Sequence, residues 1–260
     1  MNDRPIEEFT VPSVGANLAC HYKPGEDDSV AVVLSHGLTN SRQDAPLFGE
    51  LDRALAQAGL GVVGFDYFGS GESDGGFSDK TLSIMLRNLE DVLASLQRRL
   101  GPAGRVGLFG RSVGATLSGY LLSSPIVRCA VLASPPVDLV KAFGWMRCEG
   151  DGAETRMPAH IVPSGQLKGD YCLSREFFAE LPDLTAKFES AVTGAQRVLV
   201  TYGAADEKVT PMHAKRLMAL LGTDSEFVLV ADAGHNYHGF EAPVVDSAVA
   251  WFRRHLGPVR

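Results

Sequence analysis

The sequence has few cysteines, and their spacing suggests neither a metal centre nor a redox centre. Its four cysteines are Cys20, Cys129, Cys148 and Cys172, and no two of them form a C-x-x-C pair. A zinc ribbon and a thioredoxin-type motif are therefore excluded. The first residues contain no basic segment followed by an apolar one, so no secretory leader is recognised. We expect a cytoplasmic protein with reduced thiols.

Basic residues are also in short supply. Lys and Arg total 24 against 31 Asp and Glu, which gives a net charge of −7. An acidic chain without a basic cluster is not expected to bind nucleic acid or an anionic membrane surface. No apolar run approaches the roughly 18 residues that cross a bilayer. No phosphate-binding loop, H-E-x-x-H string or metal-spaced cluster occurs, so we expect neither a metal nor a cofactor.

What the sequence does contain is a regular alternation of short apolar runs and longer amphipathic runs. With 45% hydrophobic residues, this alternation predicts an α/β fold with a mostly parallel sheet covered by helices on both faces. The first two dozen residues are different and indicate an antiparallel hairpin at the sheet edge. Strands are expected at 29–35, 61–67, 105–109, 127–133, 197–202 and 226–230, and helices at 47–60, 81–100, 112–123, 211–221 and 244–256.

One long stretch breaks the alternation. Between about residues 138 and 190 no clear strand–helix unit is found, and aromatic residues lie among glycines and prolines. Such a long irregular insertion is typical of a lid. We therefore predict a core domain made of 1–138 and 191–260, with a cap at 139–190. Phe143, Trp145 and Met146 are expected to line a substrate pocket, although they could instead pack the cap onto the body.

A possible nucleophile follows the third predicted strand. Gly110-Arg111-Ser112-Val113-Gly114 matches G-x-S-x-G directly between a strand and a helix. A serine on such a sharp turn exposes its hydroxyl, and the flanking glycines leave room for the turn. The alternative is an ordinary glycine-rich turn. A G-x-G-x-x-G string at 59–64 follows a helix and enters a strand, which is the wrong context for a dinucleotide site.

A serine hydroxyl needs a general base that is oriented by a carboxylate. His235 follows the last predicted strand, and His238 is its rival nearby. Asp206 follows the preceding strand, and Glu207 is its rival. The carboxyl ends of parallel strands are where such sheets place their sites, which favours Asp206 and His235 as partners of Ser112.

The chain order Ser112, Asp206, His235 is that of the α/β-hydrolase triad. The sequence resembles the α/β-hydrolase superfamily over nearly its whole length. Ser35-His36-Gly37-Leu38 looks like the family's oxyanion loop, and the segment 66–73, D-Y-F-G-S-G-E-S, looks like its glycine-rich turn. Within the superfamily the chain is most similar to the small bacterial feruloyl- and cinnamoyl-esterase-like group, which carries a cap before the acid-bearing strand.

The resemblance implies a role for each matching position. Ser112 would attack the acyl carbonyl, His235 would move its proton, and Asp206 would orient His235. The backbone N–H groups of Leu38 and Val113 would bind the oxyanion. His36, Asp66 and Ser73 would be structural.

The elbow departs from the common pattern at Arg111, where many relatives carry an uncharged residue or histidine. Its guanidinium could pair with an acid beneath the elbow, which we favour, or attract an anionic substrate group.

Together these observations predict a serine hydrolase that cleaves carboxylic esters with small to medium apolar or aromatic acyl groups. Its substrate would be a small-molecule ester or thioester. A thioesterase or another acyl-transfer or C–C-bond enzyme of the same fold is the alternative, followed by a non-catalytic ligand receptor. Assembly into a homodimer is left open.

Overall fold

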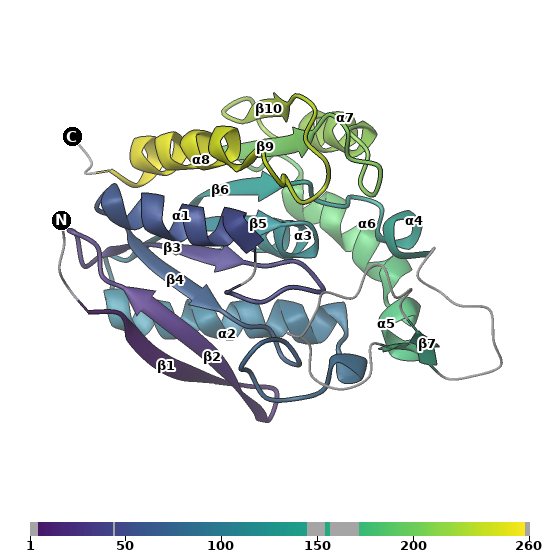
Figure 1. Cartoon of the computed structure of the whole chain (residues 1–260), viewed down its shortest axis with the longest axis horizontal. Coiled ribbons are helices and arrows are strands. Elements are labelled where there is room, and N and C mark those ends of the chain that lie inside the picture. The colour runs from purple at the N-terminus through teal and green to yellow at the C-terminus, as the bar shows by residue number, and fades with distance from the viewer. Residues whose placement is uncertain (1–4, 44, 145–153, 157–171, 258–260) are drawn as a thin grey trace.

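The computed structural model describes residues 5–43, 45–144, 154–156 and 172–257 (Figure 1). Eight strands form one mixed sheet in the order β1-β2-β4-β3-β5-β6-β9-β10. β1 pairs antiparallel with β2, and β2 with β4, while the other neighbours run parallel. The strands are β1 (Glu7–Ser13), β2 (Ala16–Lys23), β3 (Val30–Ser35), β4 (Gly61–Phe65), β5 (Arg105–Arg111), β6 (Val127–Ala133), β9 (Val198–Gly203) and β10 (Glu226–Val230).

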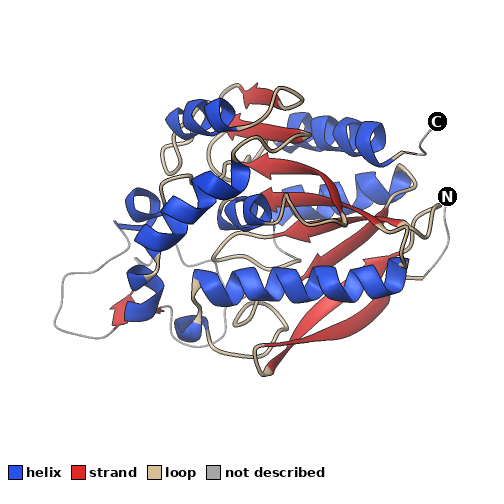
Figure 2. Cartoon of the chain, turned by 180° about the vertical axis from the view of Figure 1, so that it is seen from behind, coloured by secondary structure: helices blue, strands red, loops and turns tan. Residues whose placement is uncertain are grey.

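Helices cover both faces of this sheet (Figures 1 and 2). The buried side chains of α1 and α8 join one hydrophobic cluster. Those of α2, α3, α6 and α7 join a larger cluster on the opposite face. These helices are α1 (Ala45–Gln57), α2 (Leu82–Leu100), α3 (Val113–Tyr120), α6 (Leu181–Val192), α7 (Met212–Leu220) and α8 (Glu241–Leu256), and a short 3-10 helix, η1, spans Phe77–Asp79.

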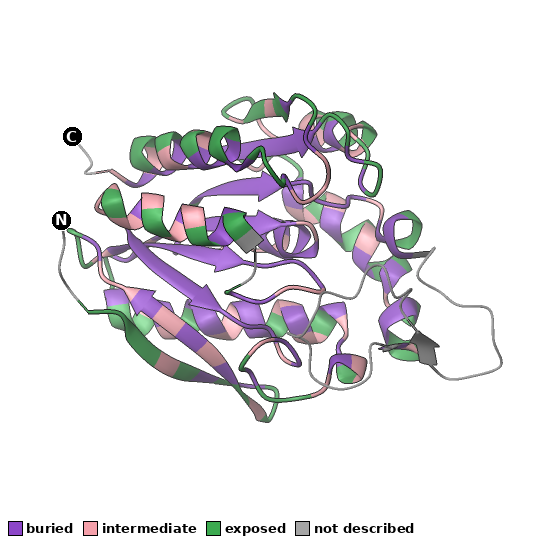
Figure 3. Ribbon diagram, in the orientation of Figure 1, coloured by how far each residue is buried: buried purple, intermediate pink, exposed green. Residues whose placement is uncertain are grey.

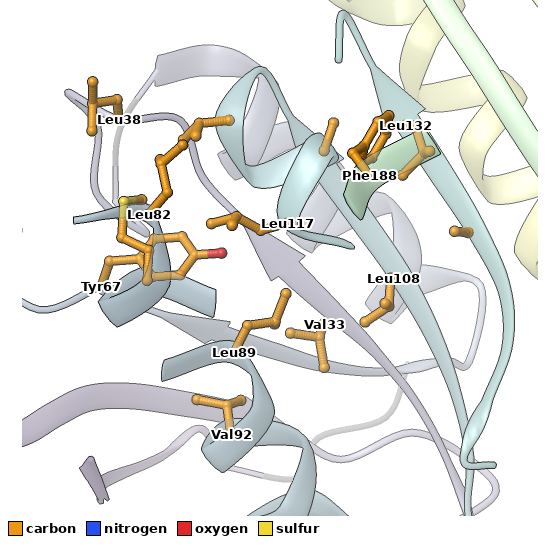
Figure 4. Close-up of a cluster of buried hydrophobic side chains, with 14 of the residues drawn as sticks. Val33, Leu38, Tyr67, Leu82, Leu89, Val92, Leu108, Leu117, Leu132 and Phe188 are labelled. Atoms are coloured by element: carbon orange, nitrogen blue, oxygen red, sulfur yellow. The ribbon is translucent and has the colours of Figure 1, made fainter. Parts of the chain in front are cut away.

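The central strands are buried on both faces (Figure 3). Successive strand residues point to opposite faces, so neighbours in β3 divide between the two clusters. Val32 packs under α1 and α8, whereas Val33 packs under α2 near Leu89 and Leu108 (Figure 4). This burial explains why the strands read as continuous apolar runs.

The predicted parallel sheet and edge hairpin are confirmed, and within the core domain the differences lie at element ends. The predicted strand 61–67 ends at Phe65, because Asp66 enters a hydrogen-bonded turn. The last helix begins at Glu241, three residues before the predicted start at Val244. Among the described residues, no helix is both long enough and apolar enough to cross a membrane.

The expectation that 138–190 lacks regular structure is wrong for the part that the structure describes. The described part of this stretch contains α4 (Leu139–Gly144), α5 (Arg175–Ala179) and most of α6, together with a small antiparallel pair, β7 (Glu154–Arg156) and β8 (Cys172–Ser174). α6 places Leu181, Leu184, Phe188 and Val192 on its buried side. This spacing is helical, but α6 follows α5 without an intervening strand, so the alternation that marked the core was missing.

Contacts with α2 and α3 are among those that attach 172–192 to the core. The carboxylate of Glu180 accepts hydrogen bonds from the Leu82 and Ser83 backbone N–H groups and from Ser83 Oγ at the start of α2. A negative charge is favourable at a helix N-terminus. Tyr120 of α3 donates its hydroxyl to the Leu184 carbonyl at 2.5 Å. Phe188 packs edge-on against the Tyr120 ring. Arg216 of α7 also forms an ion pair with Glu189, so α2, α3 and α7 all hold this segment.

Candidate active site

Ser112 lies on a strained turn between β5 and α3. Its backbone has φ 55° and ψ −125°, a conformation that a non-glycine residue adopts only when the surroundings enforce it. Its N–H donates to the Ala133 carbonyl at 2.8 Å. A Cβ at Gly110 would lie 2.4 Å from the Gly114 carbonyl oxygen, and one at Gly114 would lie 2.3 Å from the Ser35 carbonyl oxygen. Both glycines of the motif are therefore required for this turn to pack.

The structure brings Ser112, His235 and Asp206 together from three separate loops at the carboxyl end of the sheet. His235 Nε2 lies 3.0 Å from Ser112 Oγ. Its Nδ1 lies 2.8 Å from Asp206 Oδ2. The other oxygen, Asp206 Oδ1, accepts from the backbone N–H groups of Lys208 at 3.0 Å and Val209 at 2.9 Å. Hydrogen bonds therefore run in a row from Asp206 through His235 to Ser112, and this is the connectivity that activates a serine hydroxyl.

The electrostatics favour an ionised Asp206 beside a neutral His235. Burial alone would raise the pKa of Asp206, but hydrogen bonds from His235 and from the Val209 N–H hold it below the ordinary value. Burial lowers the pKa of His235, although Asp206 opposes that shift. The imidazole is therefore ready to accept a proton at neutral pH.

The two rivals from the sequence lie elsewhere. The His238 side chain is 63% exposed, and its Nδ1 lies 3.9 Å from Glu241 Oε1 on α8. Glu207 is exposed. Neither takes part in the hydrogen-bonded row that reaches Ser112.

The segment 36–38 follows β3 and faces the serine turn. His36 is fully buried, and its Nε2 accepts the Tyr67 backbone N–H at 3.1 Å. Burial lowers the pKa of His36 to about 4, so its single proton lies on Nδ1, 2.7 Å from the Gly37 carbonyl oxygen. The same peptide unit carries the Leu38 N–H. His36 thus fixes and polarises the peptide that presents this N–H, as the structural role expected for His36 requires.

Asp66 and Ser73 hold the glycine-rich turn, as expected. Asp66 accepts from the Arg42 and Glu72 backbone N–H groups and pairs with the Arg42 guanidinium. Ser73 Oγ donates to the Asp66 carbonyl at 2.6 Å and accepts the Ala19 N–H of β2. The turn is thereby tied to the edge hairpin.

Lys80 is a residue that sequence reasoning missed. It is fully buried, and its Nζ donates to Ser70 Oγ and, at 3.4 Å, to the Leu38 carbonyl. The ammonium also lies 4.6 Å from the centroid of the Phe77 ring. Burial lowers the pKa of Lys80 to about 7, against the opposing charge of Asp66. Nothing in the sequence distinguishes Lys80 from the surface lysines.

Replacing Lys80 by methionine is expected to remove a pH-dependent part of the stability. The folded protein releases the Lys80 proton near pH 7, whereas the unfolded chain keeps it to about 10.4. Between these values the unfolded state binds more protons, so this group makes wild-type stability rise with pH. Urea unfolding is measured at pH 6.5, 8.0 and 9.5 for both proteins. The free energy of unfolding of wild type minus that of Lys80→Met should rise by about 2–4 kcal/mol between pH 6.5 and 9.5.

The exposed Lys215 provides the matched control. Lys215→Met makes the same chemical change outside the core, and its difference from wild type should stay nearly constant over this range. A Lys80→Met difference that is equally constant would contradict the argument.

The residues predicted to line a substrate pocket are only partly described. Phe143 is buried at the end of α4, with its ring edge-on to Phe177 at 5.6 Å between centroids. This contact is the packing alternative considered for the aromatic residues. Trp145 and Met146 lie outside the described residues. Of the four cysteines, Cys20 and Cys129 are buried free thiols.

The fold and the hydrogen bonds that join Asp206, His235 and Ser112 are those of an α/β-hydrolase. A family model described as Hydrolase_4, serine aminopeptidase S33, matches residues 26–177, which is more than half of the chain. The chain belongs to this family, so the predicted superfamily and hydrolase class are confirmed. Within the described ranges no cluster of three or more His, Cys, Asp or Glu side chains is arranged to hold a metal ion.

Solved structures share the fold at low sequence identity. Est1E from Butyrivibrio proteoclasticus, with ferulic acid bound, superposes with a TM-score of 0.81 at 16% identity, covering 96% of this chain and 100% of Est1E. The esterase domain of a Rhodothermus marinus protein gives 0.74 at 20% identity, covering 98% and 100%. The Pyrococcus furiosus esterase Pf2001 gives 0.73 at 18% identity, covering 97% and 92%.

Curated relatives match this chain over only part of their own length. Two uncharacterized proteins from strains of Mycobacterium tuberculosis are 27% identical over 210 residues, covering 79% of this chain. The chain spans 63% of their length.

Proposed function

We propose that this protein hydrolyses carboxylic esters through an acyl-enzyme on Ser112. The observation that carries the proposal is the continuous row from Asp206 through His235 to Ser112 Oγ. Ser112 attacks the acyl carbonyl while His235 takes its proton and then gives it to the leaving alkoxide. Asp206 holds the productive tautomer and stabilises the imidazolium. Water then releases the acid by the same proton transfers.

The backbone N–H groups of Leu38 and Val113 would bind the oxyanion of each tetrahedral intermediate. Val113 is the first residue of α3, where N–H groups point out of the helix. In the described part of the chain, neither N–H is used by an internal hydrogen bond. A single donor of this kind is worth about 2.7–4 kcal/mol of transition-state stabilisation.

The acyl groups we propose are small to medium and apolar or aromatic. The fold shared with Est1E, whose solved structure holds ferulic acid, supports an aromatic acid among them. We propose that 139–190 acts as the cap that shapes this acyl site, with Phe143, Trp145 and Met146 as contributors. The free thiols of Cys20 and Cys129 fit the cytoplasmic location that we propose.

The family description favours a second candidate, removal of an N-terminal residue from a peptide. The same nucleophile and base can cleave an amide, with the proton going to an amine leaving group. An aminoacyl p-nitroanilide distinguishes this activity from ester hydrolysis.

The test is a substrate panel combined with covalent labelling. Wild-type protein is assayed on p-nitrophenyl acetate, butyrate and octanoate, methyl ferulate, one acyl thioester and one aminoacyl p-nitroanilide. A fluorophosphonate probe is then added, and peptide mass spectrometry locates the adduct. We expect ester turnover that falls in proportion to labelling at Ser112. Ester turnover that survives complete labelling of Ser112, or faster turnover of the anilide than of any ester, would overturn the proposal.

A further inference from the structure

Arg111 connects the loop that carries His235 to the turn that follows β3. It is the last residue of β5, directly before Ser112, and its side chain is only 2% exposed. Nη1 donates to Asn236 Oδ1 at 2.8 Å, and Nη2 donates to Asn40 Oδ1. The guanidinium carbon lies 5.8 Å from the centroid of the Phe48 ring on α1. A substrate anion has no open approach to a group buried in this way.

The two amides belong to different parts of the site. Asn236 directly follows His235 in the chain. Asn40 closes the turn 37–40, called here the oxyanion turn, because its N–H donates to the Gly37 carbonyl at 3.2 Å. A Cβ on Gly37 would lie 2.8 Å from Asn40 Oδ1, 3.4 Å from Arg111 Nη2 and 3.7 Å from Ser112 Cβ. Such a carbon would crowd Asn40 and would touch both Arg111 and Ser112, so these three residues meet around Gly37.

We propose that Arg111 is a positioning residue whose guanidinium holds the oxyanion turn and the His235 loop in register with Ser112. The proposal rests on the proposed function, because it assigns a catalytic purpose to this contact. A guanidinium suits the task, since its planar fork presents several N–H donors in fixed directions. Of the two roles expected for Arg111, a structural contact was favoured over attraction of an anionic substrate group, and the amide oxygens of Asn236 and Asn40 are two of its partners.

The position of Arg111 also affects the base electrostatically. Among the charged groups that act on His235, Asp206 raises its pKa, and Arg111 and Lys208 lower it. Removing the arginine charge should therefore raise the His235 pKa. Protonated His235 cannot accept the serine proton, so the low-pH limb of kcat/KM would move to higher pH.

Three variants separate the charge of Arg111 from its pair of hydrogen bonds to Asn40 and Asn236. Arg111→Lys keeps the charge but cannot reproduce the fork. Arg111→Met removes both. Asn236→Ala keeps the arginine and removes one arm. We expect each to lower kcat, by at least 10-fold for the two Arg111 variants, with KM changed by less than about threefold. Only Arg111→Met should shift the low-pH limb upward.

The deciding measurement does not depend on any substrate. The ring ¹⁵N resonances of His235 are titrated by NMR in wild type, Arg111→Lys and Arg111→Met, with thermal melts to compare folding. Asn236→Ala supplies the kinetic test should an Arg111 variant fail to fold. We expect a higher His235 pKa in Arg111→Met and a wild-type value in Arg111→Lys, because only the former lacks the charge.

The outcomes separate the two proposals. Unchanged kcat and an unchanged low-pH limb in the Arg111 variants, or unchanged kcat in Asn236→Ala, would overturn the positioning role while ester hydrolysis stands. Lower stability with wild-type kcat per labelled site would show a purely structural arginine and would also overturn it. If wild type hydrolyses no ester in the panel, the proposed function fails, and an unshifted His235 titration in Arg111→Met would then reject the electrostatic part independently.

Discussion

Replacing Ser112 by alanine is expected to lower kcat for the best ester by roughly 10⁴- to 10⁶-fold. Without Oγ no acyl-enzyme forms, and only background attack by water, helped by the remaining groups, can proceed. The substitution removes one oxygen from a turn whose backbone bond to Ala133 does not involve the side chain. KM should therefore change far less than kcat. Stopped assays with a wild-type dilution series give the range needed to measure such a loss.

The control is Ser123→Ala, which makes the same change at an exposed position in the turn after α3. Its kcat should equal that of wild type. If Ser112→Ala kept more than a few per cent of wild-type activity in a preparation free of contaminating esterase, Ser112 would not be the nucleophile.

Replacing His235 by alanine should produce a loss of similar size, about 10⁴-fold or more in kcat. The serine hydroxyl would then have no base 3.0 Å away, and the leaving group would have no acid. Asp206 would keep its backbone partners Lys208 and Val209, so the carboxylate stays solvated by the fold. Fluorophosphonate labelling of Ser112 should slow in parallel, because it needs the same proton transfer.

His238→Ala is the matched control, three residues along the same loop. Its side chain is exposed and faces Glu241, so we expect kcat within about threefold of wild type. Equal losses in the two variants would mean that the loop as a whole, and not His235 as a base, is being measured. A larger loss in His238→Ala would reverse the assignment.

The fold core was predictable because its signals are local. Val30–Ser35 and Val198–Gly203 are buried throughout, and such strands must be apolar at every position. Gly110 and Gly114 were readable as parts of a turn because contacts leave no room for a Cβ. Asp206 and His235 could be placed near Ser112 because parallel strands bring their carboxyl ends together. The same rule does not separate them from Glu207 and His238, which follow the same strands.

What could not be predicted depends on contacts between segments distant in sequence. Lys80 looks like any other lysine until Leu38 and Ser70 are placed against its ammonium. The partners of Arg111 come from loops 71 and 125 residues away, and no local pattern announces them. α6 was missed for a different reason, since its helical spacing was present but lay in a stretch judged by its lack of alternation.

The edge hairpin has a consequence for how the molecule meets other copies of itself. β4, with the sequence G-V-V-G-F and no charge, is fully buried and would be a template for a foreign strand if its edge were open. β2 occupies that edge, and β1 covers β2 in turn. β1 carries exposed Glu7 and Glu8 and includes Pro12, which offers no N–H. The hairpin thus protects the β4 edge from pairing with another chain, because this side of the sheet ends in a strand that is poorly suited to further pairing.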